Sequence, residues 1–210
     1  MAKALEIIKI LRKEYPKARI VLEYSNPIQL LVATILSAQC TDARVNIVTK
    51  TLFKKYKTVK DFANADLKTF EQEIKSTGFY HNKAKNIINA SKIILEKFNG
   101  KVPDTMEDLI SLPGVARKTA NIVLSNAYGK IEGIAVDTHV RRLSYRIGLS
   151  DNTDPEKIEQ DLMNSLPKEN WFETTYLLIE HGRKICDARK PLCDRCVIKD
   201  MCKKRINVPD

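Results

Sequence analysis

The sequence lacks long apolar runs, internal repeats and low-complexity linkers, and it has few candidate β-strands. No apolar run approaches the roughly 18 residues of a membrane-spanning helix, so we expect no membrane partner. The N-terminal segment carries Glu6 and Glu14 in an amphipathic helical pattern and has no signal-peptide core, which favours a cytoplasmic protein. ARIVLEY and GIAV are the only strand candidates and are short and isolated, so we predict an all-α fold.

Cysteine is scarce and unevenly distributed. Cys40 stands alone, whereas the other four lie near the C-terminus with the spacing C-x6-C-x2-C-x5-C: Cys186, Cys193, Cys196 and Cys202. Four thiolates in one short segment are a metal-ligand set, because soft sulfur ligands select zinc or iron–sulfur clusters. Disulfides are disfavoured in the reducing cytosol. The spacing by itself leaves Zn²⁺ and a [4Fe-4S] cluster open, and Cys40 is expected to be an inert, buried thiol.

Acidic residues are outnumbered, with 26 Asp and Glu against 36 Lys and Arg, a net charge of +10. Residues 181–205 carry nine lysines and arginines against three aspartates, or +6 of that charge. Such a balance points to a polyanionic partner such as nucleic acid, although a solvated basic surface is the alternative.

Helical periodicity dominates the remainder of the chain and predicts about nine or ten helices. Asn26-Pro27 and Asp154-Pro155 each combine an N-cap residue with a first-turn proline. In residues 105–129 a short helix is expected to end at Leu112 and a second to begin near Arg117, joined by a turn containing Gly114. The exposed N–H groups of such a hairpin can hold one phosphate, although an ordinary tight turn between helices is the alternative.

Lys118 stands in the first turn of the second helix, where the helix dipole disfavours positive charge. Partial desolvation and the neighbouring Arg117 are expected to lower its pKa further and increase the neutral amine that Schiff-base chemistry uses. A phosphate-contacting surface lysine is the alternative.

Asp137 follows an apolar stretch and precedes the predicted helix THVRRLSYRIG, which is typical of an N-cap. The same carboxylate could also face a reacting centre. His139 is interpreted as a packing or hydrogen-bonding residue.

These motifs together resemble endonuclease III, a family of helix-hairpin-helix DNA glycosylases that carry a [4Fe-4S] cluster. The resemblance rests on LPGVARKTA with Lys118, VDTHV with Asp137, LLVATILSAQCTDARV with Gln39, and the four-cysteine tail. It extends over essentially the whole chain in the family's order.

The resemblance implies a bifunctional DNA glycosylase and AP lyase that removes oxidised or ring-saturated pyrimidines from duplex DNA. Lys118 would attack C1′ of the flipped nucleotide and form an imine, and Asp137 would stabilise the cationic sugar. Gln39 would fill the hole left by that nucleotide. The segment STGFYHNKAKNI would be a second intruding loop with Phe79 or Tyr80 as the wedge, although core packing is the alternative for both. His81 lies in a variable part of this loop and leaves the lesion preference open.

Two regions would contact phosphates. One is the hairpin at Gly114, Ala116 and Arg117, where many relatives have a second glycine in place of Ala116; we expect a helical backbone there. The other is the insert DARKPL between the first two cysteines of the tail, with Arg189 and Lys190. The cluster would be structural and hold this basic loop in place.

The resemblance also implies two helical lobes flanking a DNA-binding groove: residues 21–131, and residues 1–20 with 132–210, the latter including the cluster loop 186–202. A monomer in the cytoplasm, associated with the nucleoid and bound to damaged or abasic double-stranded DNA, is expected. Two other functions compete: a mismatch glycosylase without lyase activity, and a non-catalytic DNA-binding or redox-sensing protein on the same scaffold.

Overall fold

The computed structural model describes residues 2–206, which contain helices and no strand. The all-α prediction is confirmed, with one helix more than the upper end of the predicted range. The eleven α-helices of this range are α1 (Ala2–Glu14), α2 (Pro27–Leu36), α3 (Asp42–Lys55), α4 (Val59–Ala63), α5 (Leu67–Ile74), α6 (Tyr80–Lys97), α7 (Met106–Ile110), α8 (Arg117–Tyr128), α9 (Thr138–Ile147), α10 (Pro155–Ser165) and α11 (Trp171–Lys184). None of them has both the length and the apolar character that crossing a bilayer requires.

Local sequence signals set several helix starts. The side chain of Asn26 accepts a hydrogen bond from the N–H of Gln29 at 3.0 Å, and Pro27 is the first residue of α2. Asp154 caps α10 in the same way, ahead of Pro155. Both predicted caps are confirmed, because a capping side chain and a first-turn proline act within a few residues.

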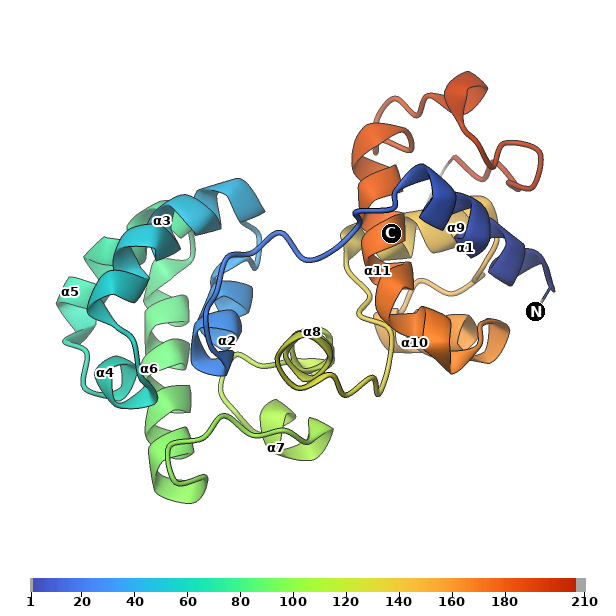
Figure 1. The fold of residues 1–210 in the computed structure, drawn as a ribbon. Helices are drawn as coiled ribbons and strands as arrows, with labels where there is room; N and C mark the ends of the chain where they lie inside the picture. The colour runs from blue at the N-terminus through green and yellow to red at the C-terminus, as the bar shows by residue number, and fades with distance from the viewer. Residues whose placement is uncertain (1, 207–210) are drawn as a thin grey trace. The chain divides into compact units, whose positions relative to one another are not determined.

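The described residues fall into two compact units (Figure 1). The hairpin unit comprises residues 21–130 and contains α2 to α8. The cysteine unit comprises residues 2–20 and 131–206 and contains α1 and α9 to α11.

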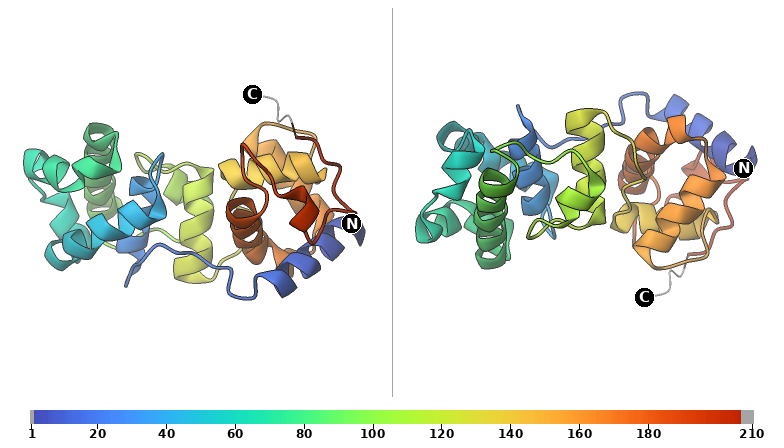
Figure 2. Two further views of the ribbon diagram at one scale, coloured as in Figure 1. Left: turned by 90° about the horizontal axis from the view of Figure 1, so that it is seen from above. Right: turned by 90° about the horizontal axis from the view of Figure 1, so that it is seen from below.

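The hairpin unit is organised around α6, against which α4 and α5 pack, while α2 packs against α8 (Figure 2). Its aromatic core includes Tyr56, whose ring is stacked on that of Phe62 with centroids 5.4 Å apart. Phe70 meets both rings edge-on. These buried contacts join α4 to α5, the two helices that pack against α6.

In the cysteine unit, α11 packs against α1 and α9. Ile7, Leu11, Leu143 and Leu177 are buried in the shared core. After α11 the chain returns along the end of α9, where the N–H of Lys203 donates to the carbonyl of Ile147 at 3.2 Å. The tail that carries the cysteines is therefore tied to α9 as well as to α11.

Candidate functional site

The hairpin of residues 105–129 is present, with its first helix shorter than predicted. α7 ends at Ile110 rather than Leu112, because the N–H of Leu112 bonds the carbonyl of Leu109 in a tighter final turn. Gly114 has φ +78°, and an added Cβ would lie 2.9 Å from the Cβ of Asn86. Glycine is therefore required here both by the backbone conformation and by the close approach of α6.

Ala116 is the N-cap of α8 and has φ −95° and ψ 170°. The helical backbone expected at this residue is wrong: the chain is still extended and turns helical only at Arg117, where α8 begins as predicted. Alanine is unstrained at this negative φ. Its side chain cannot accept a hydrogen bond, so α8 has no side-chain bond from its N-cap residue, unlike α2, α3 and α9.

Lys118 is the second residue of α8 and is half-buried, while Thr119 and Ala120 after it are buried in the hairpin unit. Its amine therefore belongs to the same helix end, whose N-cap residue makes no side-chain bond. An anionic sugar-phosphate held by that end would lie within reach of a lysine in the first turn.

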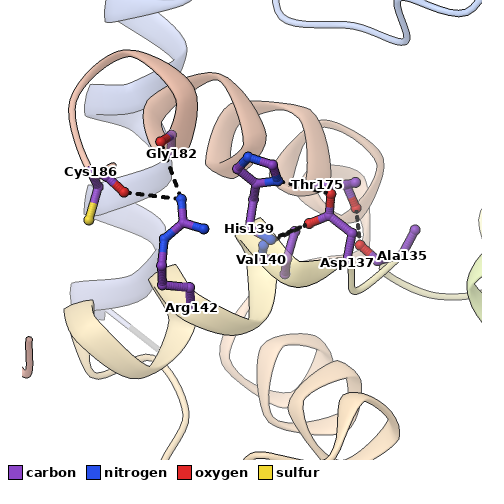
Figure 3. Close-up of polar contacts among 8 residues, drawn as sticks. All are labelled: Ala135, Asp137, His139, Val140, Arg142, Thr175, Gly182 and Cys186. Atoms are coloured by element: carbon purple, nitrogen blue, oxygen red, sulfur yellow. Dashed lines mark hydrogen bonds and ion pairs between the residues drawn. The ribbon is translucent and has the colours of Figure 1, made fainter. Parts of the chain in front are cut away.

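Asp137 is the N-cap of α9, as predicted (Figure 3). Its Oδ1 accepts hydrogen bonds from the N–H groups of His139 at 2.9 Å and Val140 at 2.8 Å. Its Oδ2 lies 3.4 Å from Nδ1 of His139, and 20% of the side chain is exposed. Oδ1 therefore holds the N-terminus of the helix, and the side chain as a whole is partly exposed.

The segment before Asp137 is held from α11. The hydroxyl of Thr175 donates to the carbonyl of Ala135 at 3.0 Å (Figure 3). From α9, Arg142 donates to the carbonyls of Gly182 and Cys186 at 3.2 and 3.1 Å, and burial lowers the pKa of this guanidinium. One network thus links the end of α11, the first cysteine of the tail and the helix that Asp137 caps.

The two predicted intruding segments both lie in the hairpin unit. Gln39 is exposed in the turn after α2 and has φ +52°. Phe79 directly precedes α6, has φ +49° and is 63% exposed. Core packing, the alternative for Phe79, is therefore wrong. A positive φ outside glycine costs energy and is retained where the surroundings enforce it.

Of the residues next to these two, His81 is exposed, whereas Tyr80 and Cys40 are less so. Tyr80 is half-buried, and its ring lies 4.1 Å from that of His81, whose Nδ1 is 2.9 Å from a carboxylate oxygen of Glu71. Cys40 is half-exposed rather than buried, which corrects the expectation of a buried thiol. Its Sγ is 3.7 Å from the carbonyl of Thr41.

The four cysteines of the tail line one cavity, together with apolar side chains that include Ile147, Ile185 and Leu192. Burial is the largest cause that raises the pKa values of Cys196 and Cys202, and the neighbouring cysteines raise them further. A cationic metal centre would stabilise the thiolate forms of Cys196 and Cys202 against this burial.

Arg146, on α9, lines the same cavity as the four cysteines. The sequence did not lead us to predict a role for this residue. It is only 4% exposed and donates to the carbonyls of Asp187 and Ala188, each at 2.7 Å. It also lies 3.6 Å from Sγ of Cys186, while the N–H of Lys204 lies 3.3 Å from Sγ of Cys202. Such N–H donors to sulfur are a means by which proteins tune iron–sulfur clusters. Arg142 and Arg146 are four residues apart and therefore lie on one face of α9, and this spacing could have indicated that both contact the same segment.

His181 supports the same cavity from α11. Its Nδ1 is 3.0 Å from the hydroxyl of Tyr15, and its Nε2 is 3.4 Å from Sγ of Cys196. Burial lowers the pKa of His181 to about 4 and raises that of Tyr15 to about 12. Both side chains are therefore neutral near neutral pH and act as hydrogen-bonding groups.

The donor set fits an iron–sulfur cluster. The four cysteines line one shared cavity, and four cysteine thiolates are the ligands that hold a [4Fe-4S] centre.

The loop between the first two cysteines of the tail presents its charges outward. Arg189 and Lys190 are exposed, and their N–H groups donate to Oδ1 of Asp187 at 2.9 and 3.1 Å. These backbone hydrogen bonds lower the pKa of Asp187. The turn therefore keeps a fixed backbone from which the two cationic side chains extend.

Models of known protein families match both the hairpin region and the cysteine tail. Residues 32–168 match the HhH-GPD superfamily of base excision DNA repair proteins, and this span includes the hairpin, Lys118 and Asp137. Residues 186–202 match the iron-sulfur binding domain of endonuclease III, with the four cysteines. The cofactor of the tail is therefore a [4Fe-4S] cluster.

Individual proteins are similar over nearly the whole chain. The Endonuclease III of Synechocystis sp. is 54% identical over 200 residues, which cover 95% of this chain and 91% of that protein. A solved non-covalent endonuclease III–DNA complex matches with a TM-score of 0.91 at 44% identity, covering 95% of this chain and 93% of the other. A trapped endonuclease III–DNA covalent intermediate matches with a TM-score of 0.90 at 44% identity, covering 94% and 92%. The chain belongs to the endonuclease III family of the HhH-GPD superfamily of base excision DNA repair proteins.

Proposed function

We propose that this protein removes oxidised or ring-saturated pyrimidines from duplex DNA and cleaves the strand through a Schiff base on Lys118. Its family membership makes it a DNA glycosylase with AP lyase activity. The observation that carries the residue assignment is the place of Lys118, half-buried in the first turn of α8 beside the hairpin. The covalent intermediate solved for a relative supports a nucleophile of this kind.

The proposed reaction begins with attack of the Lys118 amine on C1′ of the flipped nucleotide. The glycosidic bond breaks, the base leaves with the electron pair and takes up a proton, and the amine nitrogen loses its protons as the sugar opens to an imine. Loss of a proton from C2′ then expels the 3′ phosphate by β-elimination. Water finally hydrolyses the imine and restores Lys118.

Asp137 supplies the negative charge in this proposal. A carboxylate next to C1′ stabilises the positive charge that develops on the sugar as the base leaves, and it can accept a proton from the amine. The geometry of α9 supports this role, because Oδ1 is committed to the helix N-terminus while Oδ2 lies 3.4 Å from Nδ1 of His139 on a partly exposed side chain.

DNA contacts are proposed at three places. Gln39 and Phe79 enter the DNA duplex at the flipped nucleotide, with Tyr80 and His81 beside them. The start of α8, with Gly114, Ala116 and Arg117, binds one backbone phosphate without reading bases.

The loop of the cysteine tail provides the third contact. Arg189 and Lys190 bind further phosphates from this loop, which the [4Fe-4S] cluster would hold through Cys186, Cys193, Cys196 and Cys202. When bound, the cluster supplies a structural cross-link for the tail.

We also propose that residues 21–131 and residues 1–20 with 132–210 act as two functional lobes. The grouping of contacts within residues 21–130 and within 2–20 with 131–206 supports this division. Residue 1 and residues 207–210 lie outside the described part of the chain. A monomer that works in the cytoplasm at the nucleoid is the expected state.

Borohydride reduction during reaction with abasic duplex DNA tests the proposal. The wild-type protein should be trapped covalently, and Lys118→Gln should abolish trapping while retaining binding to damaged DNA. Lys101→Gln, at an exposed lysine of the same unit, is the matched control. Mass spectrometry should locate the reduced sugar on Lys118. Base release without trapping would instead indicate a mismatch glycosylase, and binding without either reaction a non-catalytic protein.

A further inference from the structure

Lys83 is a buried lysine on α6 that the proposed chemistry does not use. It is only 5% exposed and lies in the apolar stripe of that helix, one turn before the buried Ile87. Lysine is rarely buried unless its ammonium is hydrogen-bonded. Its Nζ donates two hydrogen bonds, to the carbonyl of Leu36 at 2.8 Å and to the carbonyl of Thr77 at 2.8 Å.

Both acceptors are carbonyls at helix ends. Leu36 is the last residue of α2, and Thr77 is the last residue of the 3₁₀ helix η1 (Lys75–Thr77). Terminal carbonyls have no intrahelical donor. The N–H of Cys40, four residues after Leu36, bonds the carbonyl of Ser37 instead. The ammonium therefore supplies the missing donor to each end, and its charge also suits the C-terminus of α2.

The two carbonyls stand just before the two candidate intruding residues. Gln39 follows Leu36 by three residues, and Phe79 follows Thr77 by two. Both have left-handed backbone conformations, with φ of +52° and +49°. Such conformations persist where the surrounding structure determines them. Lys83 is the described side chain that bonds directly to both segments.

We propose that Lys83 is a positioning residue that couples the Gln39 turn to the Phe79 loop, so that both enter the DNA duplex as one rigid pair. This inference rests on the proposed function of those two segments. Without the ammonium, each loop loses its bond to the other and the two must be ordered separately when DNA binds. Lesion recognition in a duplex then suffers, while the chemistry at Lys118 does not.

Single-stranded abasic DNA separates these effects, because it has no opposite strand and no stack to enter. The main variant is Lys83→Met, which keeps the length of the side chain and removes its donors. Lys92→Met, at an exposed lysine on the same helix, controls for charge. Ile94→Val, in the buried face of that helix, controls for loss of stability. Lys83→Gln is a milder variant that retains an N–H donor, should Lys83→Met fail to fold.

We expect Lys83→Met to lower single-turnover borohydride trapping on abasic duplex DNA by about tenfold to a hundredfold, the scale of a misplaced site. Trapping on single-stranded abasic DNA should remain close to wild type. Lys83→Gln should show the same duplex-specific loss to a smaller extent. An equal loss on both substrates, or a loss matched by Ile94→Val, would overturn the proposal, as would no loss at all.

A second readout does not depend on Lys118. 2-Aminopurine placed beside a stable abasic analogue in a duplex brightens when protein side chains disrupt its stacking. Wild type and Lys118→Gln should both increase this fluorescence, and Lys83→Met should remove most of the increase in either background. If wild type were never trapped, the role of Lys118 would be wrong, and the fluorescence would still decide the role of Lys83: an undiminished signal in Lys83→Met would refute it.

Discussion

The guanidinium of Arg146 and the carbonyl of Asp187 are joined by a 2.7 Å hydrogen bond that fixes the first turn of the loop after Cys186. A second bond of the same length reaches Ala188. A buried side chain on α9 therefore determines where the basic loop of the tail begins.

Replacement of Arg146 should loosen the cysteine segment. Arg146→Met leaves two carbonyls without their donor, at a cost of about 1–3 kcal/mol each where they remain desolvated. We expect lower iron content and faster loss of visible absorbance in the presence of a chelator. Arg195→Met, at an exposed arginine of the same tail that does not line the cysteine cavity, should behave as wild type. Equal iron retention in both variants would exclude a supporting role for Arg146.

Asparagine at position 137 should separate the structural role of the side chain from its chemical role. Asn is as good an N-cap as Asp, so Asp137→Asn should keep α9 intact and leave the melting temperature of the protein nearly unchanged. The lost charge should slow base excision by about 10²–10³-fold in single-turnover assays. Asp154→Asn makes the same change at the N-cap of α10 and should leave excision unaffected. A similar loss in both variants would show that only capping matters.

Alanine at position 114 should damage the phosphate site. Its backbone has φ +78°, which costs an L-residue about 1–2 kcal/mol, and the added methyl would press on Asn86. Affinity for undamaged and damaged duplexes should fall together, because a phosphate contact carries no base information. Gly129→Ala imposes a similar left-handed strain with no atom within 4 Å, and it is the matched control in fluorescence anisotropy. Loss confined to damaged DNA would contradict this assignment.

The exposed loop cations should be visible in the salt dependence of binding. Arg189→Ala and Lys190→Ala should each reduce the slope of log affinity against log salt by about 0.9, as expected for one lost phosphate contact. Lys97→Ala, at the exposed end of α6, should leave the slope unchanged. If the affinity drops while the slope stays the same, the loop side chains do not meet phosphates.

Features that depend on a few neighbouring residues were predictable. Asn26, Asp137 and Asp154 cap their helices because a capping side chain needs only the N–H groups two or three residues ahead. The start of α8 at Arg117 was also predictable, because it too depends on neighbouring residues. The extended backbone of Ala116 was not predicted, because the preceding turn and the contact of Gly114 with α6 together set it.

Features that depend on distant contacts were missed. Lys83 stands in an apolar stripe, which was a signal, but its acceptor in α2 is 47 residues away in sequence. Arg146 reaches a carbonyl 41 residues ahead. Cys40 was expected to be buried, yet the turn in which it lies leaves it half-exposed.

The sequence by itself determined the all-α class, the spacing of the four tail cysteines, the lysine of the hairpin and the carboxylate that caps α9, because each depends on residue type and short spacing. Only the tertiary structure decided which main-chain carbonyls the buried cations Lys83 and Arg146 bond. Hydrogen bonds to main-chain carbonyls carry no sequence signature, since every residue offers the same acceptor and only the fold brings one of them to Lys83 or Arg146.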